Sequence, residues 1–130
     1  AFSEGRSTAA AEIRLRMVAV SAAGAATNPG GAAAGRAVAQ AAAVAHMGAH
    51  AFGAAAYAVR AVTLARPDQP DLGKDELYWQ LGELTAPERA ALRQLPALGS
   101  DSAGPLGPGL LTRGRLGDIV RQLQTAITDD

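Results

Sequence analysis

Two histidines, His46 and His50, are the residues best suited to chemistry in this sequence. Their four-residue spacing would place both imidazole rings on one face of a helix, the geometry of a bidentate pair of metal ligands. A zinc site needs at least one more ligand, and the intervening residues include no acid that could serve as a base. The alternative is that both histidines are interior polar groups, bonded to backbone carbonyls or a carboxylate across a helix interface.

Other routes to catalysis find little support in the residue types. The sequence has no cysteine and no Gly-x-Ser-x-Gly motif, which argues against thiol and hydrolase nucleophiles. The glycine-rich run 104–109 lacks the Lys-Ser/Thr ending of a phosphate-binding loop, and its two prolines remove amide donors. The carboxylates Asp75, Glu76 and Glu83 are expected on a solvated helix face. We therefore predict no enzyme activity, no catalytic residue and no cofactor.

The charge balance excludes one class of partner. Twelve basic and twelve acidic residues cancel, and no basic block of five or more residues occurs. A nucleic-acid binder normally shows such a block or a strong positive excess. We therefore expect no nucleic-acid partner.

An uncharged stretch of 23 residues, 37–59, raises the question of a membrane span. The stretch consists mainly of alanine and glycine, which gain little from transfer into lipid, and it carries Gln40, His46 and His50. A buried central helix is the better interpretation, so we expect no membrane association. No signal peptide is visible, and the cytoplasm is the default compartment.

Composition and periodicity predict an all-α fold. Alanine supplies 32 positions, 26 of them before Pro67, and alanine is the strongest helix former. Three- and four-residue spacing, cap residues and breakers predict helices, which cover residues 8–26, 32–65 with a break near Gly48, 74–84, 86–95 and 115–127. Thr85 and Glu88 have the spacing of a capping box at the start of the fourth.

The same spacing suggests which residues are buried. We expect Ile13, Met17 and Val20 to form the inward stripe of the first helix, and Trp79 to anchor the core. Leucines at positions 98, 106, 110 and 111 are expected to pin the Gly/Pro-rich loop 99–109. The prediction is a compact bundle of about five to six helices, with alanine-rich central helices and an ordered loop before the C-terminal helix. Residues 1–130 are expected to form a single helical domain.

Several blocks of sequence carry a resemblance to a known family. The run AAVAHMGAHAFGAAAYAV at residues 42–59 resembles bacterial immunity proteins of polymorphic toxin systems, of the type called immunity-protein-five-like. Later blocks are similar to that family in the same order, namely YWQL at 78–81, ERAALR at 88–93, LP at 95–96 and GPLGPGLL at 104–111. The resemblance extends from about residue 32 onward, and it implies that a further helical region precedes residue 1.

The resemblance implies an α-helical protein that binds and neutralises a toxin without catalysis. The leading hypothesis is therefore a protein-binding module with a cognate toxin as its partner. A second hypothesis is a metal- or small-ligand-binding protein that uses His46 and His50 with a carboxylate from another helix. A third is a structural oligomerisation domain, because Gly35, Ala39 and Ala43 would allow helices of two chains to approach closely.

Overall fold

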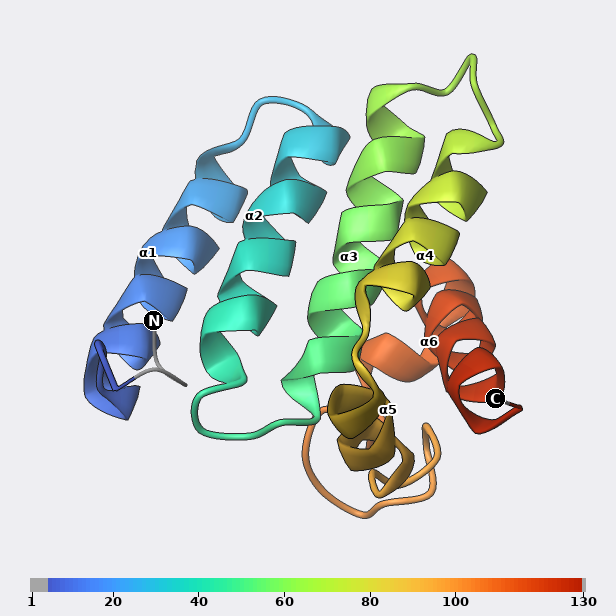
Figure 1. The fold of residues 1–130 in the computed structure, drawn as a ribbon. Coiled ribbons are helices and arrows are strands. Elements are labelled where there is room, and N and C mark those ends of the chain that lie inside the picture. Colours follow the sequence, from blue (N-terminus) through green and yellow to red (C-terminus); the bar gives the residue numbers. More distant parts are fainter. Residues whose placement is uncertain (1–4, 130) are drawn as a thin grey trace.

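The computed structural model describes residues 5–129, which form six α-helices and no strand. The helices are α1 (Ala9–Ala25), α2 (Pro29–Ala43), α3 (His50–Ala65), α4 (Leu72–Glu83), α5 (Ala86–Arg93) and α6 (Gly114–Thr128), with a 3-10 turn η1 (Leu110–Thr112) before α6. Figure 1 shows α1, α2 and α3 side by side in chain order, with α4 and α6 beyond α3. The predicted all-α bundle is confirmed.

The helix boundaries follow local chemistry. The side chains of Thr8 and Asn28 accept hydrogen bonds from first-turn amides of α1 and α2, which satisfies donors that a helix start leaves unpaired. The capping box predicted at Thr85 and Glu88 is present: the Thr85 amide donates to Glu88 Oε2 at 2.8 Å, and the Glu88 amide donates to Thr85 Oγ1 at 3.5 Å.

The long alanine-rich stretch folds back on itself. α2 ends at Ala43, and tight turns over residues 44–49 lead into α3 at His50. A continuous helix would have left alanine faces in water, whereas the reversal packs α2 along α3 and buries Ala39, Ala43 and Ala56. The break expected near Gly48 is confirmed.

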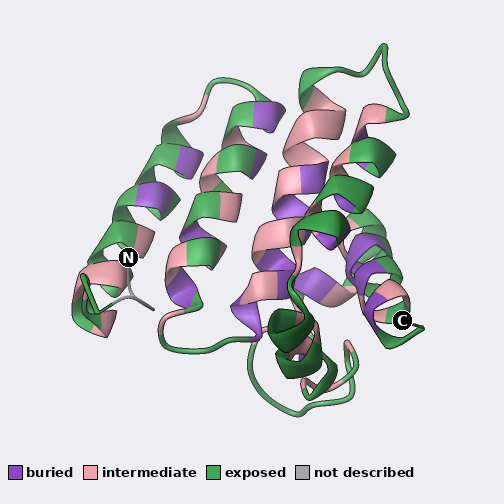
Figure 2. Ribbon diagram, viewed as in Figure 1, coloured by how far each residue is buried: buried purple, intermediate pink, exposed green. Residues whose placement is uncertain are grey.

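Large apolar side chains gather between α3, α4 and α6. This core contains Phe52, Val59, Leu77, Leu81, Leu106, Ile119, Val120, Leu123 and Ile127. Four of these residues, Ile119, Val120, Leu123 and Ile127, lie on α6. Figure 2 shows the burial concentrated on α3 and α6, while α1 carries few buried positions.

Helix α1 packs differently from the prediction. Its buried residues are Ala19 and Ala23, whereas Ile13, Met17 and Val20 are exposed, so the predicted stripe was wrong. The reason is size: a Cβ at Gly35 of α2 would lie 2.8 Å from Ala23 Cβ, so the two helices meet where side chains are smallest. Side-chain size, rather than hydrophobicity, therefore determines which face of α1 packs against α2.

Two further burial predictions were wrong. Trp79 is 61% exposed, because Leu77 and Leu81 turn the opposite face of α4 toward the core. In the Gly/Pro-rich loop, Leu106 and Leu111 are buried as predicted and Leu98 is partly buried, but Leu110 is 64% exposed.

None of the helices in residues 5–129 has the length and apolar character that a membrane span requires.

Candidate functional site

His50 is held by a polar contact between two helices. It is the first residue of α3, it is 8% exposed, and its Nδ1 donates a hydrogen bond to Gln40 Oε1 of α2 at 2.7 Å. Gly53 makes room for this contact, because a Cβ there would lie 2.5 Å from the same oxygen. His50 is therefore an interior group satisfied by a side-chain amide, where the sequence suggested a backbone carbonyl or a carboxylate.

His46 occupies a different environment. It lies in the turn after α2 and is exposed, so the prediction that both rings share one helix face was wrong. The turn nevertheless brings the rings together, with centroids 5.1 Å apart and planes at 57°. Residues 5–129 contain no group of three or more His, Cys, Asp or Glu side chains placed to hold a metal ion. A metal at this pair would need ligands from outside the described residues.

The surroundings keep His50 in its neutral form. Burial lowers the pKa of His50 below its ordinary value of 6.5, and the positive charges of His46 and Arg16 lower it further. At neutral pH the ring therefore carries one proton, and the bond to Gln40 Oε1 places that proton on Nδ1. This arrangement suits a structural hydrogen bond between α2 and α3.

The region near His50 opens into a pocket of about 330 Å³. Its wall on α1 includes Arg16 and Val20, its wall on α2 includes Arg36 and Gln40, and Tyr57 of α3 also lines it. Leu110 of η1 contributes an exposed apolar side chain at the rim. Burial raises the pKa of the Tyr57 hydroxyl, and the nearby Arg36 opposes that shift. The pocket thus combines two arginines, neutral polar groups and apolar walls.

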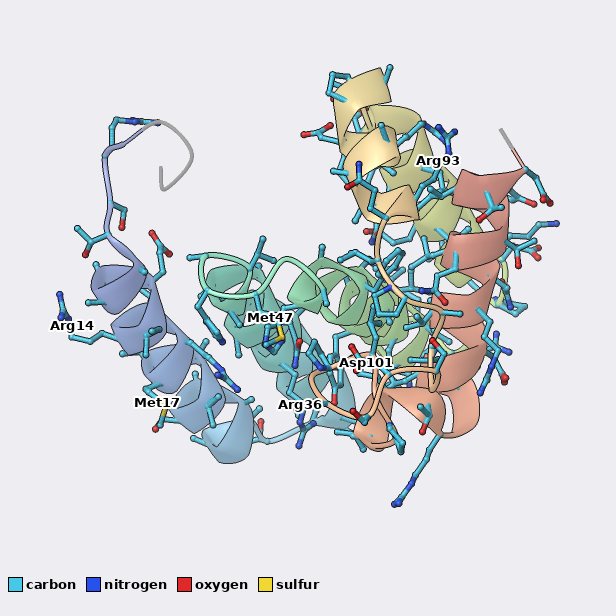
Figure 3. The ribbon with its side chains drawn as sticks, turned by 90° about the horizontal axis from the view of Figure 1, so that it is seen from below. Arg14, Met17, Arg36, Met47, Arg93 and Asp101 are labelled. Carbon is cyan, nitrogen blue, oxygen red and sulfur yellow. The ribbon has the colours of Figure 1, made fainter. Side chains whose placement is uncertain are left out.

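Among the residues that the structure describes, no carboxylate lines this pocket. Within the part of the chain that the structure describes, neither Arg16 nor Arg36 forms an ion pair. In Figure 3 the exposed Arg36 lies toward the middle of the molecule, whereas Arg14 of α1 points away from the rest of it. The two arginines of the pocket are therefore placed to meet a negatively charged group that none of the described residues supplies.

The charged residues are distributed unequally between the two halves of the sequence, although the net charge of the whole is zero. Residues 1–67 hold six arginines and two carboxylates, whereas residues 68–130 hold six basic residues and ten carboxylates. Residues 13–67 contain no Asp or Glu at all. A comparison of the charge of the two halves would have identified the first half as basic.

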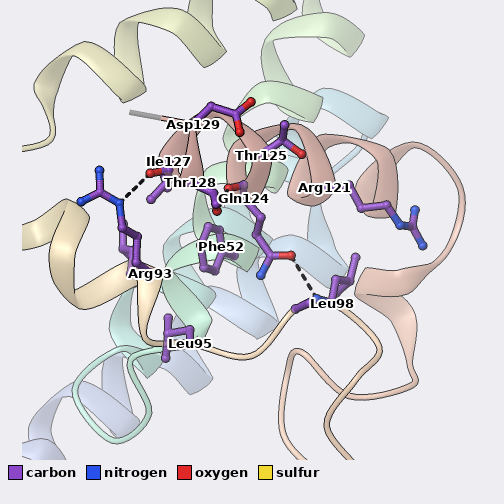
Figure 4. A pocket seen from close by; sticks show the side chains of 12 residues that line it. Phe52, Arg93, Leu95, Leu98, Arg121, Gln124, Thr125, Ile127, Thr128 and Asp129 are labelled. Carbon is purple, nitrogen blue, oxygen red and sulfur yellow. Dashed lines mark hydrogen bonds between the residues drawn. The ribbon is translucent and has the colours of Figure 1, made fainter.

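A larger pocket of about 510 Å³ lies between α6 and the segment that follows α5 (Figure 4). Its polar groups serve the fold: Arg93 Nε donates to the Ile127 carbonyl at 2.8 Å, and Gln124 Oε1 accepts from the Leu98 amide at 3.0 Å. Gln124 Nε2 also donates to the Pro96 carbonyl at 3.0 Å. We therefore favour the smaller pocket, because Arg16 and Arg36 have no hydrogen-bond or ion-pair partner among the described residues.

The carboxylates considered for acid–base chemistry do not converge. Asp75 and Glu83 are exposed on α4, and Glu76 Oε1 accepts a hydrogen bond from Gln80 Nε2 of the same helix at 2.8 Å.

The Gly/Pro-rich loop packs against the turn that carries His46, since a Cβ at Gly104 would lie 3.2 Å from Met47 Sδ. Gly104 has a φ of 78°, a conformation that favours glycine.

Comparison with known protein families identifies the group to which this fold belongs. The family described as "Imm-5 like putative immunity protein" matches residues 1–87. The chain belongs to this family. No curated protein and no solved structure matches the chain.

The span of this immunity-protein match refines the resemblance seen in the sequence. The match includes α1, which the resemblance had left outside, and it ends before the later blocks at 88–93, 95–96 and 104–111. Every lining residue of the smaller pocket except Leu110 lies within it. The pocket is thus built almost entirely from the matched part of the chain.

Proposed function

We propose that this protein is a non-catalytic binding module that neutralises a bacterial toxin by forming a complex with it. The observation that carries the proposal is membership of an immunity-protein family. No convergent acid–base or nucleophilic set occurs among the described residues, which fits neutralisation by binding better than by turnover.

The surface offers apolar side chains that a partner could cover. The large exposed apolar residues are Ile13, Leu15, Met17, Val18 and Val20 of α1, Val38, Val44 and Met47 of α2 and its following turn, Tyr78 and Trp79 of α4, and Leu110 of η1. Clusters of such residues on a folded protein mark interaction surfaces. Their concentration on α1 supports recognition of another protein.

The other two hypotheses find less support. Gly35 packs on Ala23, and Ala39 and Ala43 are buried, so these small residues already hold helices of the same chain together. A metal site at His46 and His50 stays a prediction, which elemental analysis of the purified protein and of His50→Ala would test. The buried ring and its bond to Gln40 favour a structural role for His50.

Co-expression tests the proposed function directly. The open reading frame beside this gene is expressed in a bacterial host, with and without this chain carrying an affinity tag. We expect the neighbouring product to stop growth, the chain to restore it, and the two proteins to co-purify. Restored growth without a complex, or a toxic neighbour that the chain neither binds nor counteracts, would overturn the proposal.

A further inference from the structure

The pocket between α1, α2 and η1 has the chemistry of a carboxylate receptor. Arg16 and Arg36 approach it from different helices, and guanidinium groups bind carboxylates through paired hydrogen bonds. The hydroxyl of Tyr57 adds a neutral polar group. Gln40 Oε1 already accepts from His50, so the free hydrogen-bonding group of that amide is its Nε2 donor.

The walls of the pocket specify more than a charge. Val20 is 46% exposed and Leu110 is 64% exposed, and the two stand on α1 and η1 respectively. On α1, Met17 extends the apolar surface beyond Val20, since residues three positions apart are neighbours on a helix. A ligand that fits must therefore bring apolar groups beside its carboxylate, which a protein segment does and a free anion does not.

The charge of the surroundings points to the same occupant. The absence of carboxylates from residues 13–67 means that a negative group entering the pocket meets no repulsion from α2 or α3. Two arginines in one pocket are too few for a nucleic-acid backbone, which needs a longer basic track. An acidic side chain set among apolar residues is complementary to both features.

We propose that this pocket receives a glutamate or aspartate side chain of the toxin, bound by Arg16 and Arg36, while adjacent apolar residues of the toxin cover Val20 and Leu110. The proposal rests on the proposed function and names the surface that performs it. It makes α1 and α2 the centre of the interface and leaves Tyr78 and Trp79 of α4 outside it.

Charge reversal provides a matched test within one helix. Arg14 and Arg16 are two positions apart on α1, but Arg16 lines the pocket and Arg14 faces solvent. We expect Arg16→Glu and Arg36→Glu each to weaken the complex with the neighbouring gene product at least tenfold, and Arg14→Glu to change it less than threefold. Circular dichroism of each variant checks that the helices remain folded.

The outcomes separate this proposal from the proposed function. If the complex forms and neither pocket variant weakens it, the pocket proposal is wrong and toxin binding stands. If Trp79→Glu abolishes binding while both pocket variants bind normally, the interface lies on α4 and the pocket proposal is again overturned. If the neighbouring gene product binds neither the wild type nor any variant, the result contradicts the proposed function itself.

A second experiment needs no toxin. The 15N-labelled protein is titrated with the peptide Ac-Leu-Glu-Leu-Leu-amide, with its glutamine analogue and with sodium glutamate. We expect saturable shifts at amides of α1 and α2 around the pocket for the acidic peptide, and at least tenfold weaker responses to the other two. Equal responses to the glutamine peptide, or shifts that persist in Arg16→Glu, would contradict carboxylate recognition.

Self-association is the remaining alternative occupant. The acidic second half of another copy could approach the basic first half, because the two halves carry opposite net charges. Sedimentation of the wild type at several concentrations tests this directly. We expect a monomer, and a dimer that Arg16→Glu dissociates would assign the pocket to a second copy and overturn the toxin proposal.

Discussion

Helices α1 and α6 have similar lengths, 17 and 15 residues, but they are attached to the protein by different means. α6 buries Ile119, Val120, Leu123 and Ile127, whereas α1 buries Ala19 and Ala23. A buried leucine or isoleucine contributes about 1.5–3 kcal/mol, and a single methyl group about 0.8 kcal/mol. α6 is held by apolar area, and α1 by the close approach of small residues.

This difference decides which side chains remain available to a partner. Where large residues fill the core, as on α6, the outward face is polar, with Arg121 and Gln122 exposed. Where alanines make the contact, as on α1, the large apolar residues stay on the surface. Close packing through alanine thus leaves α1 with an exposed apolar surface.

The largest expected effect comes from comparing a leucine in the large apolar core with a leucine at the rim of the smaller pocket. Leu106 is 1% exposed in the large core, and Leu110 lies at the rim of the pocket. We expect Leu106→Ala to lower the free energy of unfolding by about 2–5 kcal/mol and Leu110→Ala by less than about 0.5 kcal/mol. Urea unfolding measures both, and equal losses would show that the rim leucine belongs to the core.

A smaller effect is expected where α1 meets α2. Gly35→Ala places a methyl group against Ala23, including its backbone nitrogen at 3.0 Å, so we expect a loss of about 1–3 kcal/mol. Gly82→Ala in α4 is the control, because a Cβ there meets nothing within 4 Å. It should gain about 0.5–1 kcal/mol from helix propensity. A stabilised Gly35→Ala protein would contradict the close approach.

The pH dependence of stability tests the junction at His50. The pKa of His50 is lowered in the folded protein, so below pH 6.5 the unfolded chain binds the proton more readily than the folded one. The free energy of unfolding should therefore fall as the pH decreases from 6.5 to the lowered pKa, and this contribution should then level off. Urea unfolding across this range measures the fall, and His50→Asn should reduce it.

Ring titration by NMR gives the complementary check. We expect the titration midpoint of His50 to lie below 6.5, and to move upward in His46→Ala, because removal of a neighbouring positive charge favours the protonated ring. A midpoint at or above 6.5 in the wild type would show that the ring is not buried as described.

The smallest effect is expected for Trp79, the exposed tryptophan of α4. Trp79→Ala should change the free energy of unfolding by no more than about 0.5 kcal/mol, because the side chain is mostly in solvent. Leu77→Ala, two positions earlier and buried, should cost several times as much. A large loss from Trp79→Ala would restore the role of core anchor that the sequence suggested.

Sequence reasoning located the elements better than their faces. Breakers and caps act over a few residues, so the break near Gly48 and the capping box at Thr85 were predicted correctly, although α2 begins at Pro29, three residues earlier than predicted. The inward face of α1 depended on Gly35 of the next helix, a contact that no local pattern encodes. On α4, Leu77 and Leu81 determine the inward face, and the larger ring of Trp79 is left on the opposite, exposed face.

The candidate site was predicted in part for the same reason. His46 and His50 were visible because their residue type is rare in the chain, although their separation into a turn and a helix depended on where α2 ended. Arg16 and Arg36 lie 20 positions apart in the sequence, and the packing of α1 on α2 brings them to one pocket. The missing carboxylates of residues 13–67 were the available signal.

The attachment of α1 through alanine has an evolutionary consequence. Met17 and Val18 are more than half exposed, so selection for stability places little constraint on them. Under the proposed function, recognition and folding are thus assigned to different residues of one helix. If the proposed toxin binding holds, a few substitutions on this outward surface would be enough to redirect the protein to a new toxin while its scaffold stays the same.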